Sequence, residues 1–316
     1  MARSAQPPTG KPLNPEEQPP ELPSSFGRPL DPGSFLPRIS RALLFMVLWY
    51  LLWIYLPRIL SHVLPGASFL TRLEVTYVLF DAALLVESWL FLRAFDRRSF
   101  GTLGLWFYSG WGREFALGMG IGGALIGLVV AILVGLGALR YAGPSGGLGE
   151  LLGPLGAEAG LLLLAAIFEE LAFRGYAFQR LLEALGPFAA VLVFAALFGV
   201  VHLTNPSATS LSTASTALSG VLLAVAYLKT RGLWLPIGLH WMWNFLMGPI
   251  LALPVSGIDF GTTLLRARMS GTTWLTGGEY GPEGGVVVVG VIVPAIFCLA
   301  RSRRLATSPA MEEALQ

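Results

Sequence analysis

Charged residues are scarce in this sequence of 316 residues. Asp, Glu, Lys and Arg together make up 13% of it, whereas an ordinary soluble domain contains about 25%. Hydrophobic residues make up 54%, and the mean hydropathy is +0.66. This balance excludes a water-soluble globular protein and predicts a chain that crosses a membrane several times.

Basic runs and cysteines are also nearly absent, and each absence excludes a class of site. The net charge is only +2 and no basic run alternates with aromatic residues, so nucleic acid is excluded as a partner. The single cysteine, Cys298, rules out a disulfide framework and a metal site built on paired cysteines. Because Cys298 lies in an apolar run, we expect its side chain to be buried.

The chain divides into a tail, a long apolar region and a short end. Residues 1–37 hold ten of the 22 prolines and few apolar clusters, so we expect a disordered, proline-rich aqueous tail. This tail lacks the basic and apolar segments of a signal peptide. Residues 38–305 form the expected membrane domain, and residues 306–316 form a C-terminal tail.

Apolar stretches of near-spanning length fill residues 38–305. They cover approximately residues 39–60, 75–95, 116–139, 157–179, 188–203, 213–228, 233–253 and 286–300. None alternates like a barrel strand, and backbone groups in hydrocarbon must bond within their own segment, so each stretch is predicted to be a helix. The predicted fold is all-α, a polytopic membrane helix bundle of about eight transmembrane helices. In the third stretch, Gly118 and Gly122 have a spacing that lets helix backbones approach closely.

Lysine and arginine residues near the ends of the stretches predict the orientation. With a cytoplasmic N-terminus, fifteen of them fall on the cytoplasmic side and five on the other side, as the positive-inside rule requires. We therefore expect a multi-pass integral protein of the cell membrane, embedded in the lipid bilayer, with both termini in the cytoplasm.

Two adjacent glutamates, Glu169 and Glu170, follow an apolar run in the fourth stretch. Glu170 and Arg174 lie four residues apart on one helix face, with the glutamate nearer the N-terminus, which suits an ion pair. Glu169 points about 140° away from Arg174 and needs another partner. An ionisable group at the bilayer centre costs about 2.5–3.5 kcal/mol. The two glutamates and Arg174 therefore indicate a functional site, or a structural network in which both glutamates share Arg174 and Arg180.

Polar side chains also interrupt the fifth and seventh stretches. His202 lies near the end of the fifth, where Asn205-Pro206 stops the helix. His240 and Asn244 lie four residues apart on one face of the seventh. A lone histidine near a helix end is usually a structural group. Two histidines and an amide in hydrocarbon point to a common cavity, because an unpaired buried polar atom costs about 1–3 kcal/mol.

Two chemistries fit these side chains. In the first, Glu169 and His202 deprotonate a water molecule that attacks an amide, and His240 and Asn244 donate hydrogen bonds to the oxyanion. In the second, Glu169, His202 and His240 hold Zn²⁺, whose bound water attacks. The zinc alternative leaves Asn244 without a role and lacks a contiguous H-E-x-x-H motif. We therefore favour water activation with no obligatory cofactor.

The heights of the two histidines along their helices disagree. If the fifth stretch enters the membrane at residue 188, His202 lies about 21 Å along its helix. His240 lies only about 10 Å along the seventh stretch, which begins at residue 233. A tilted helix, or a fifth helix that begins outside the hydrocarbon, would bring the two side chains together. A re-entrant segment or the opposite orientation would do so differently, so the side on which the cavity opens stays open.

The polar residues form three ordered motifs on separate apolar stretches: Glu169-Glu170-x-x-x-Arg174, Phe198-x-x-x-His202 and His240-x-x-x-Asn244. Over residues 155–250 they resemble the CPBP family of CAAX proteases and bacteriocin-processing enzymes, which includes the type II CAAX prenyl endopeptidases. The resemblance implies an eight-helix intramembrane endopeptidase in which Glu169 and His202 activate water, while the second histidine and the asparagine stabilise the oxyanion. It also implies that Glu170 and Arg174 support and orient these groups.

The resemblance implies a membrane-associated peptide or protein substrate, lipidated in the prenyl endopeptidases, which release the last three residues after a prenylated cysteine. Two other classes stay open. A proton-coupled transporter would use the glutamates and histidines as a relay, and paired inverted repeats with broken helices, which the sequence does not show, would support it. A non-catalytic immunity or scaffold member of the same family would bind a peptide or partner with the same residues.

Overall fold

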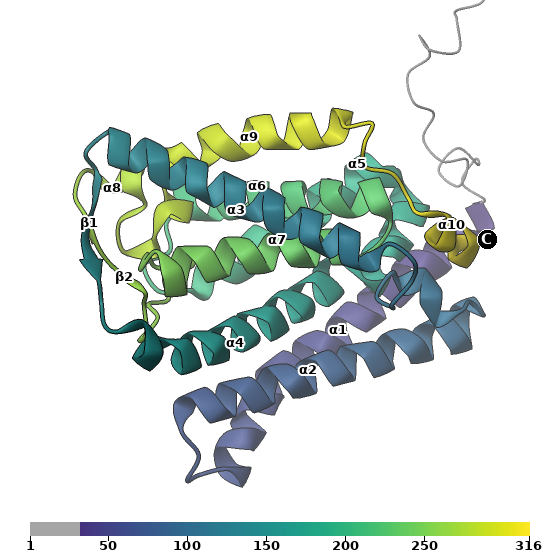
Figure 1. The fold of residues 1–316 in the computed structure, drawn as a ribbon. Helices are drawn as coiled ribbons and strands as arrows, with labels where there is room; N and C mark the ends of the chain where they lie inside the picture. The colour runs from purple at the N-terminus through teal and green to yellow at the C-terminus, as the bar shows by residue number, and fades with distance from the viewer. Residues whose placement is uncertain (1–31) are drawn as a thin grey trace, which may run out of the picture.

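The computed structural model describes residues 32–316 as a bundle of long helices (Figure 1). The long helices are α1 (Pro32–Val63), α2 (Phe69–Phe91), α3 (Trp111–Gly135), α4 (Leu148–Arg174), α5 (Tyr176–Val201), α6 (Ser210–Thr230), α7 (Trp234–Phe245) and α9 (Val286–Arg301). Each predicted apolar stretch coincides largely with one of these helices, which confirms the all-α class. The expected tail, residues 1–37, lies mostly outside the described residues.

Five segments within residues 32–316 are long and apolar enough to cross a membrane. They are Phe35–Val63, Leu70–Asp96, Trp111–Gly135, Gly149–Thr204 and Ser210–Thr230. The fourth of these segments runs through both α4 and α5. Length and composition therefore support an integral membrane protein.

Short elements connect the long helices. They are the π-helical segments η2 (Leu92–Asp96) and η5 (Leu246–Ile250), the 3₁₀ turns η3 (Phe100–Leu103), η4 (His202–Thr204), η6 (Gly278–Tyr280) and η7 (Pro282–Gly284), and the helices α8 (Thr273–Thr276) and α10 (Pro309–Leu315). Strands β1 (Leu139–Pro144) and β2 (Leu265–Met269) pair antiparallel, with Arg140 opposite Arg268, and are a small exception to the all-α fold. The expected C-terminal tail contains α10, which packs against η3.

Cys298 is exposed on α9, so the prediction of a buried cysteine is wrong. Apolar residues of a membrane helix face either the bundle or the lipid, and an apolar sequence does not distinguish the two. Neighbouring Phe297 is likewise 56% exposed, whereas Leu299 is buried. Cys298 therefore lies on the outer side of this helix.

Helix α3 packs closely along α7, the helix that carries the third motif (Figure 1). Gly118 and Gly122 make this approach possible, because a Cβ atom at either position would collide with the backbone of Leu235 or Leu239. The small-residue spacing in the sequence thus marks a true helix contact.

Aromatic side chains fix α4 against α1 and α2 immediately beside the glutamate pair. Phe168 stacks on Phe80 of α2, with 4.8 Å between ring centroids. It also meets Trp49 and Trp53 of α1 edge to face, at 6.3 and 6.1 Å. Such aromatic pairs contribute about 0.5–1.5 kcal/mol each beyond their area burial. The packing of Phe168 therefore sets the rotation of α4 and the direction in which the next residue points.

The chain reverses direction within α5. Gly186 has a φ of 78° and a ψ of 170°, a backbone conformation that favours glycine, and Pro187 follows it. Two aromatic contacts span this turn: Phe178 meets Phe194 with a centroid distance of 5.3 Å, and Phe173 meets Phe198 at 5.0 Å. Residues at equal distances before and after Gly186 therefore lie side by side.

Candidate active site

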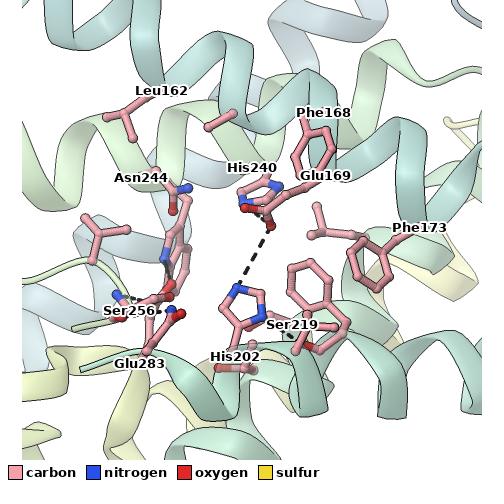
Figure 2. A pocket seen from close by; sticks show the side chains of 18 of the residues that line it. Leu162, Phe168, Glu169, Phe173, His202, Ser219, His240, Asn244, Ser256 and Glu283 are labelled. Atoms are coloured by element: carbon pink, nitrogen blue, oxygen red, sulfur yellow. Dashed lines mark hydrogen bonds and ion pairs between the residues drawn. The ribbon is translucent and has the colours of Figure 1, made fainter. Parts of the chain in front are cut away.

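A cavity of about 210 Å³ lies where α4, the end of α5, α6 and α7 meet (Figure 2). Most of its wall is aliphatic or aromatic. Its polar lining side chains are Tyr77, Glu169, His202, Asn205, Thr216, Ser219, His240, Trp243, Asn244, Ser256 and Glu283. The structure thus brings Glu169, His202, His240 and Asn244 to one cavity, as the three motifs predicted.

Glu169 lies between the two histidines. Its Oε2 atom is 4.0 Å from Nε2 of His202 and 3.8 Å from Nε2 of His240. These distances are too long for direct hydrogen bonds and suit a single water molecule that bridges the groups. Within residues 32–316 this buried oxygen has no hydrogen-bond partner. The side chain as a whole is 22% exposed and faces the cavity (Figure 2).

Glu170 has a different environment from its neighbour. Its Oε1 atom lies 3.0 Å from Nη1 of Arg174, as the four-residue spacing predicted, and 2.9 Å from Nδ1 of His240. Arg174 also donates to the carbonyl oxygen of Gly220 on α6, at 2.9 Å. Both Glu170 and Arg174 are fully buried. This chain of contacts fixes the ring of His240 so that Nε2 faces the cavity.

Arg180, the second cation of the alternative ion-pair network, lies elsewhere. Its guanidinium is 3.4 Å from Asp96 and 3.1 Å from Glu183. The prediction that both glutamates share Arg174 and Arg180 is therefore wrong. The physical reason is that Arg180 follows the break at Gly175 and points to the end of the bundle where α1 and η2 meet.

Phe198, the first residue of the second motif, orients His202. The carbonyl oxygen of Phe198 lies 2.6 Å from Nδ1 of His202, one helical turn later. A proton on Nδ1 donates to this carbonyl and leaves Nε2 free to face Glu169. The ring of Phe198 also covers the guanidinium of Arg174, with Cζ 4.7 Å from the ring centroid. The second motif therefore connects α5 to α4.

Asn244 lies one turn after His240 on α7, on the same side of the cavity (Figure 2). It is 9% exposed, and its side chain has no hydrogen-bond partner within the described part of the chain. Its carboxamide can therefore donate a hydrogen bond to a molecule that enters the cavity.

His202 and His240 lie at the same level along the bundle, because the first part of α5 extends beyond the level at which α7 begins. The side-chain amide of Gln179 donates to the carbonyl oxygen of Leu103, at 3.1 Å. The backbone N–H of Leu233, at the start of α7, donates to the next carbonyl oxygen, that of Gly104, at 2.9 Å. Gln179 and the start of α7 are therefore level. The turn at Gly186 lies roughly 10 Å further along α5, which accounts for the mismatch expected from the sequence.

Glu283 in η7 is a second carboxylate in the cavity wall, beside Glu169, and the sequence motifs did not predict it. Its Oε1 accepts a hydrogen bond from the indole N–H of Trp243, at 2.9 Å. Its Oε2 accepts from the backbone N–H and the hydroxyl of Ser256, at 2.8 and 2.7 Å. In the sequence, Glu283 is marked only by the Gly284-Gly285 pair that follows it. Its distance along the chain from the three motifs does not indicate that it lies near them in the fold.

The zinc candidates do not form a metal-binding geometry. Within residues 32–316, no group of three or more His, Cys, Asp or Glu residues is placed to hold a metal ion. Glu169 stands about 4 Å from each histidine nitrogen.

The fold and cavity define an α-helical integral membrane protein with a glutamate–histidine site between its helices. Residues 153–246 match the model of a family described as type II CAAX prenyl endopeptidase Rce1-like. The match contains all three motifs and confirms the resemblance to the CPBP family of intramembrane proteases. No curated protein and no solved structure matches the chain. Glu283 lies outside the matched segment.

Proposed function

We propose that this protein is an intramembrane endopeptidase that hydrolyses a peptide bond near the membrane surface. The observation that supports this most directly is the position of the Glu169 carboxylate, about 4 Å from Nε2 of both His202 and His240 in one cavity. The family match over residues 153–246 supports the same class of reaction.

Glu169 and His202 activate the water in this proposal. With a proton on Nδ1, His202 presents a lone pair at Nε2 and accepts a hydrogen bond from the water. Glu169 removes a proton from the water as its oxygen attacks the carbonyl carbon of the peptide. The proton then passes to the peptide nitrogen, the C–N bond breaks, and a carboxylate and an amine are released.

His240 and Asn244 stabilise the negative charge that develops on the carbonyl oxygen. Nδ1 of His240 is held by Glu170, so in the doubly protonated ring Nε2–H donates into the cavity. The Asn244 amide is the second donor. Removal of one such donor typically lowers kcat about 10²- to 10³-fold. Glu170 and Arg174 position His240 and do not contact the substrate.

A lipidated peptide or protein at the membrane is the proposed substrate. The side of the cavity toward α1 and α2 is lined by Trp53, Tyr77 and Phe80, together with Phe168 and Phe173 of α4. This aromatic wall can contact a hydrophobic chain attached to the peptide.

The membrane arrangement follows from the helices and the basic residues. We propose that all eight long helices cross the cell membrane, with both termini in the cytoplasm. Mapping cysteines introduced in the exposed β1–β2 ladder and at α10 with an impermeant thiol reagent tests this arrangement, because the two sites are expected on opposite sides. Cys298 is first replaced by serine.

No metal is required in the proposed reaction, and zinc is the alternative. Activity before and after chelation, with metal content measured in the same preparation, separates the two. Loss of activity on chelation and its return with Zn²⁺ would favour the alternative.

The central experiment compares Glu169→Ala and His202→Ala with the unchanged protein in lipid nanodiscs, using a fluorogenic lipidated peptide. Glu279→Gln is the matched control, because Glu279 is exposed and its side chain, among the described residues, accepts a hydrogen bond from Ser207 alone, outside the cavity lining. We expect cleavage to be lost in the first two variants and kept in the control. Undiminished turnover in either Glu169→Ala or His202→Ala overturns the mechanism. Substrate uptake into proteoliposomes would instead support a transporter.

A further inference from the structure

Glu283 is a buried carboxylate without a cationic partner. It is 9% exposed, and its three hydrogen bonds come from neutral donors, the indole of Trp243 and the backbone and hydroxyl groups of Ser256. No Lys, Arg or His within residues 32–316 forms an ion pair with it. A buried charge without a counter-charge is costly, so a cation from outside the chain would stabilise this site.

Among the described residues, no cation of the cavity lining pairs with Glu283, because the two histidines face Glu169 and Glu170. The cavity lining includes no Lys or Arg, and its carboxylates are Glu169 and Glu283. The buried guanidinium of Arg174 is paired with Glu170. With two carboxylates and no Lys or Arg in its lining, the cavity attracts positive groups.

Glu283 can accept one more hydrogen bond. A carboxylate offers about four acceptor positions, and its partners in the protein occupy three. Glu283 and Ser256 lie across the cavity from Glu169 (Figure 2). Thr216 and Ser219 of α6 line the cavity as well. A Lys or Arg side chain that reaches this region therefore finds a carboxylate and polar neighbours.

We propose that Glu283 is a specificity-determining residue that binds a positively charged side chain of the peptide substrate. This rests on the proposed endopeptidase function and names the chemistry of the substrate beside the cleaved bond. The aromatic wall contacts the hydrophobic part of the substrate, and the region around Glu283 contacts the cationic part. A carboxylate at the same position is repelled.

The test is a peptide series in which one position at a time, on both sides of the cleaved bond, carries Lys, norleucine or Glu. Norleucine matches the length of lysine without its charge. At one position we expect kcat/KM for Lys to exceed that for norleucine by at least about tenfold, the factor that corresponds to 1.4 kcal/mol, and Glu to be the poorest. Equal rates for Lys and norleucine at every position overturn the proposal.

The variant Glu283→Gln should remove the preference for Lys at that position, while the control Glu279→Gln keeps it. A preference that survives in folded Glu283→Gln also overturns the proposal. Thermal unfolding verifies that Glu283→Gln is folded. If this variant does not fold, the comparison of Lys and norleucine peptides on the unchanged protein decides whether the proposal holds. If no peptide is cleaved, the proposed function fails. In that case, binding of the same peptides to the protein, followed by fluorescence anisotropy, still tests Glu283, because equal affinity for Lys and norleucine peptides contradicts its role.

Discussion

The two adjacent glutamates should respond in opposite ways to the same substitution. Glu169→Gln and Glu170→Gln each replace one carboxylate by an amide of the same shape. Glu169 faces the cavity and is 22% exposed, whereas Glu170 is fully buried against Arg174 and His240. We therefore expect Glu169→Gln to affect catalysis and Glu170→Gln to affect stability first.

The magnitudes follow from the contacts that each change removes. Glu169→Gln breaks no direct hydrogen bond within the described residues, so stability should change by no more than about 0.5 kcal/mol. Loss of a general base should lower kcat about 10²- to 10⁴-fold. Glu170→Gln removes the negative charge beside Arg174, which is 1% exposed, and leaves its guanidinium with neutral oxygen acceptors such as the carbonyl oxygen of Gly220. Breaking a buried ion pair in this way costs about 3–5 kcal/mol of unfolding free energy.

The assay measures both quantities on the same preparations. Unfolding is followed in detergent by thermal denaturation, and turnover of the lipidated peptide is expressed per folded molecule. Glu279→Gln serves again as the control and should leave both values unchanged. If Glu169→Gln destabilises the protein as much as Glu170→Gln does, the division of roles between the two glutamates is refuted.

Three further outcomes are expected. Asn244→Ala should lower kcat about 10²- to 10³-fold with little change in KM, and unchanged kcat would remove Asn244 from the oxyanion site. Gly122→Val should lower the thermal stability of the bundle, because the added side chain collides with the backbone of Leu239, whereas Gly120→Val, with open space around it, should not. Chelation should leave the cleavage rate unchanged, and a loss that Zn²⁺ restores would contradict the metal-free mechanism.

Much of the site could be predicted because its residues obey local helix geometry. The four-residue spacing placed Glu170 beside Arg174, and the structure shows this ion pair at 3.0 Å. The same geometry required another partner for Glu169, which the two histidines provide. Charged and polar residues in apolar helices are few, so they were readily recognised as a group.

Other features depended on contacts that no local pattern contains. The common height of the histidines results from the turn at Gly186 and from backbone contacts at residues 103–104. Glu283 reaches the cavity from a loop outside the apolar stretches. Acidic residues are common in loops, so the sequence does not distinguish it as a site residue. The side of α9 on which Cys298 lies was also misjudged, because lipid and protein core are equally apolar environments.

The close contact between α3 and α7 connects the site to the thickness of the surrounding bilayer. On other faces of α3, Leu117 and Leu128 are exposed, so this helix meets lipid and can tilt when the hydrocarbon layer becomes thinner or thicker. At Gly118 and Gly122 the backbone of α3 is in direct contact with the backbone of α7. We therefore expect α7 to move together with α3. Lipids of different chain length would in this way shift His240 relative to Glu169 without touching either residue.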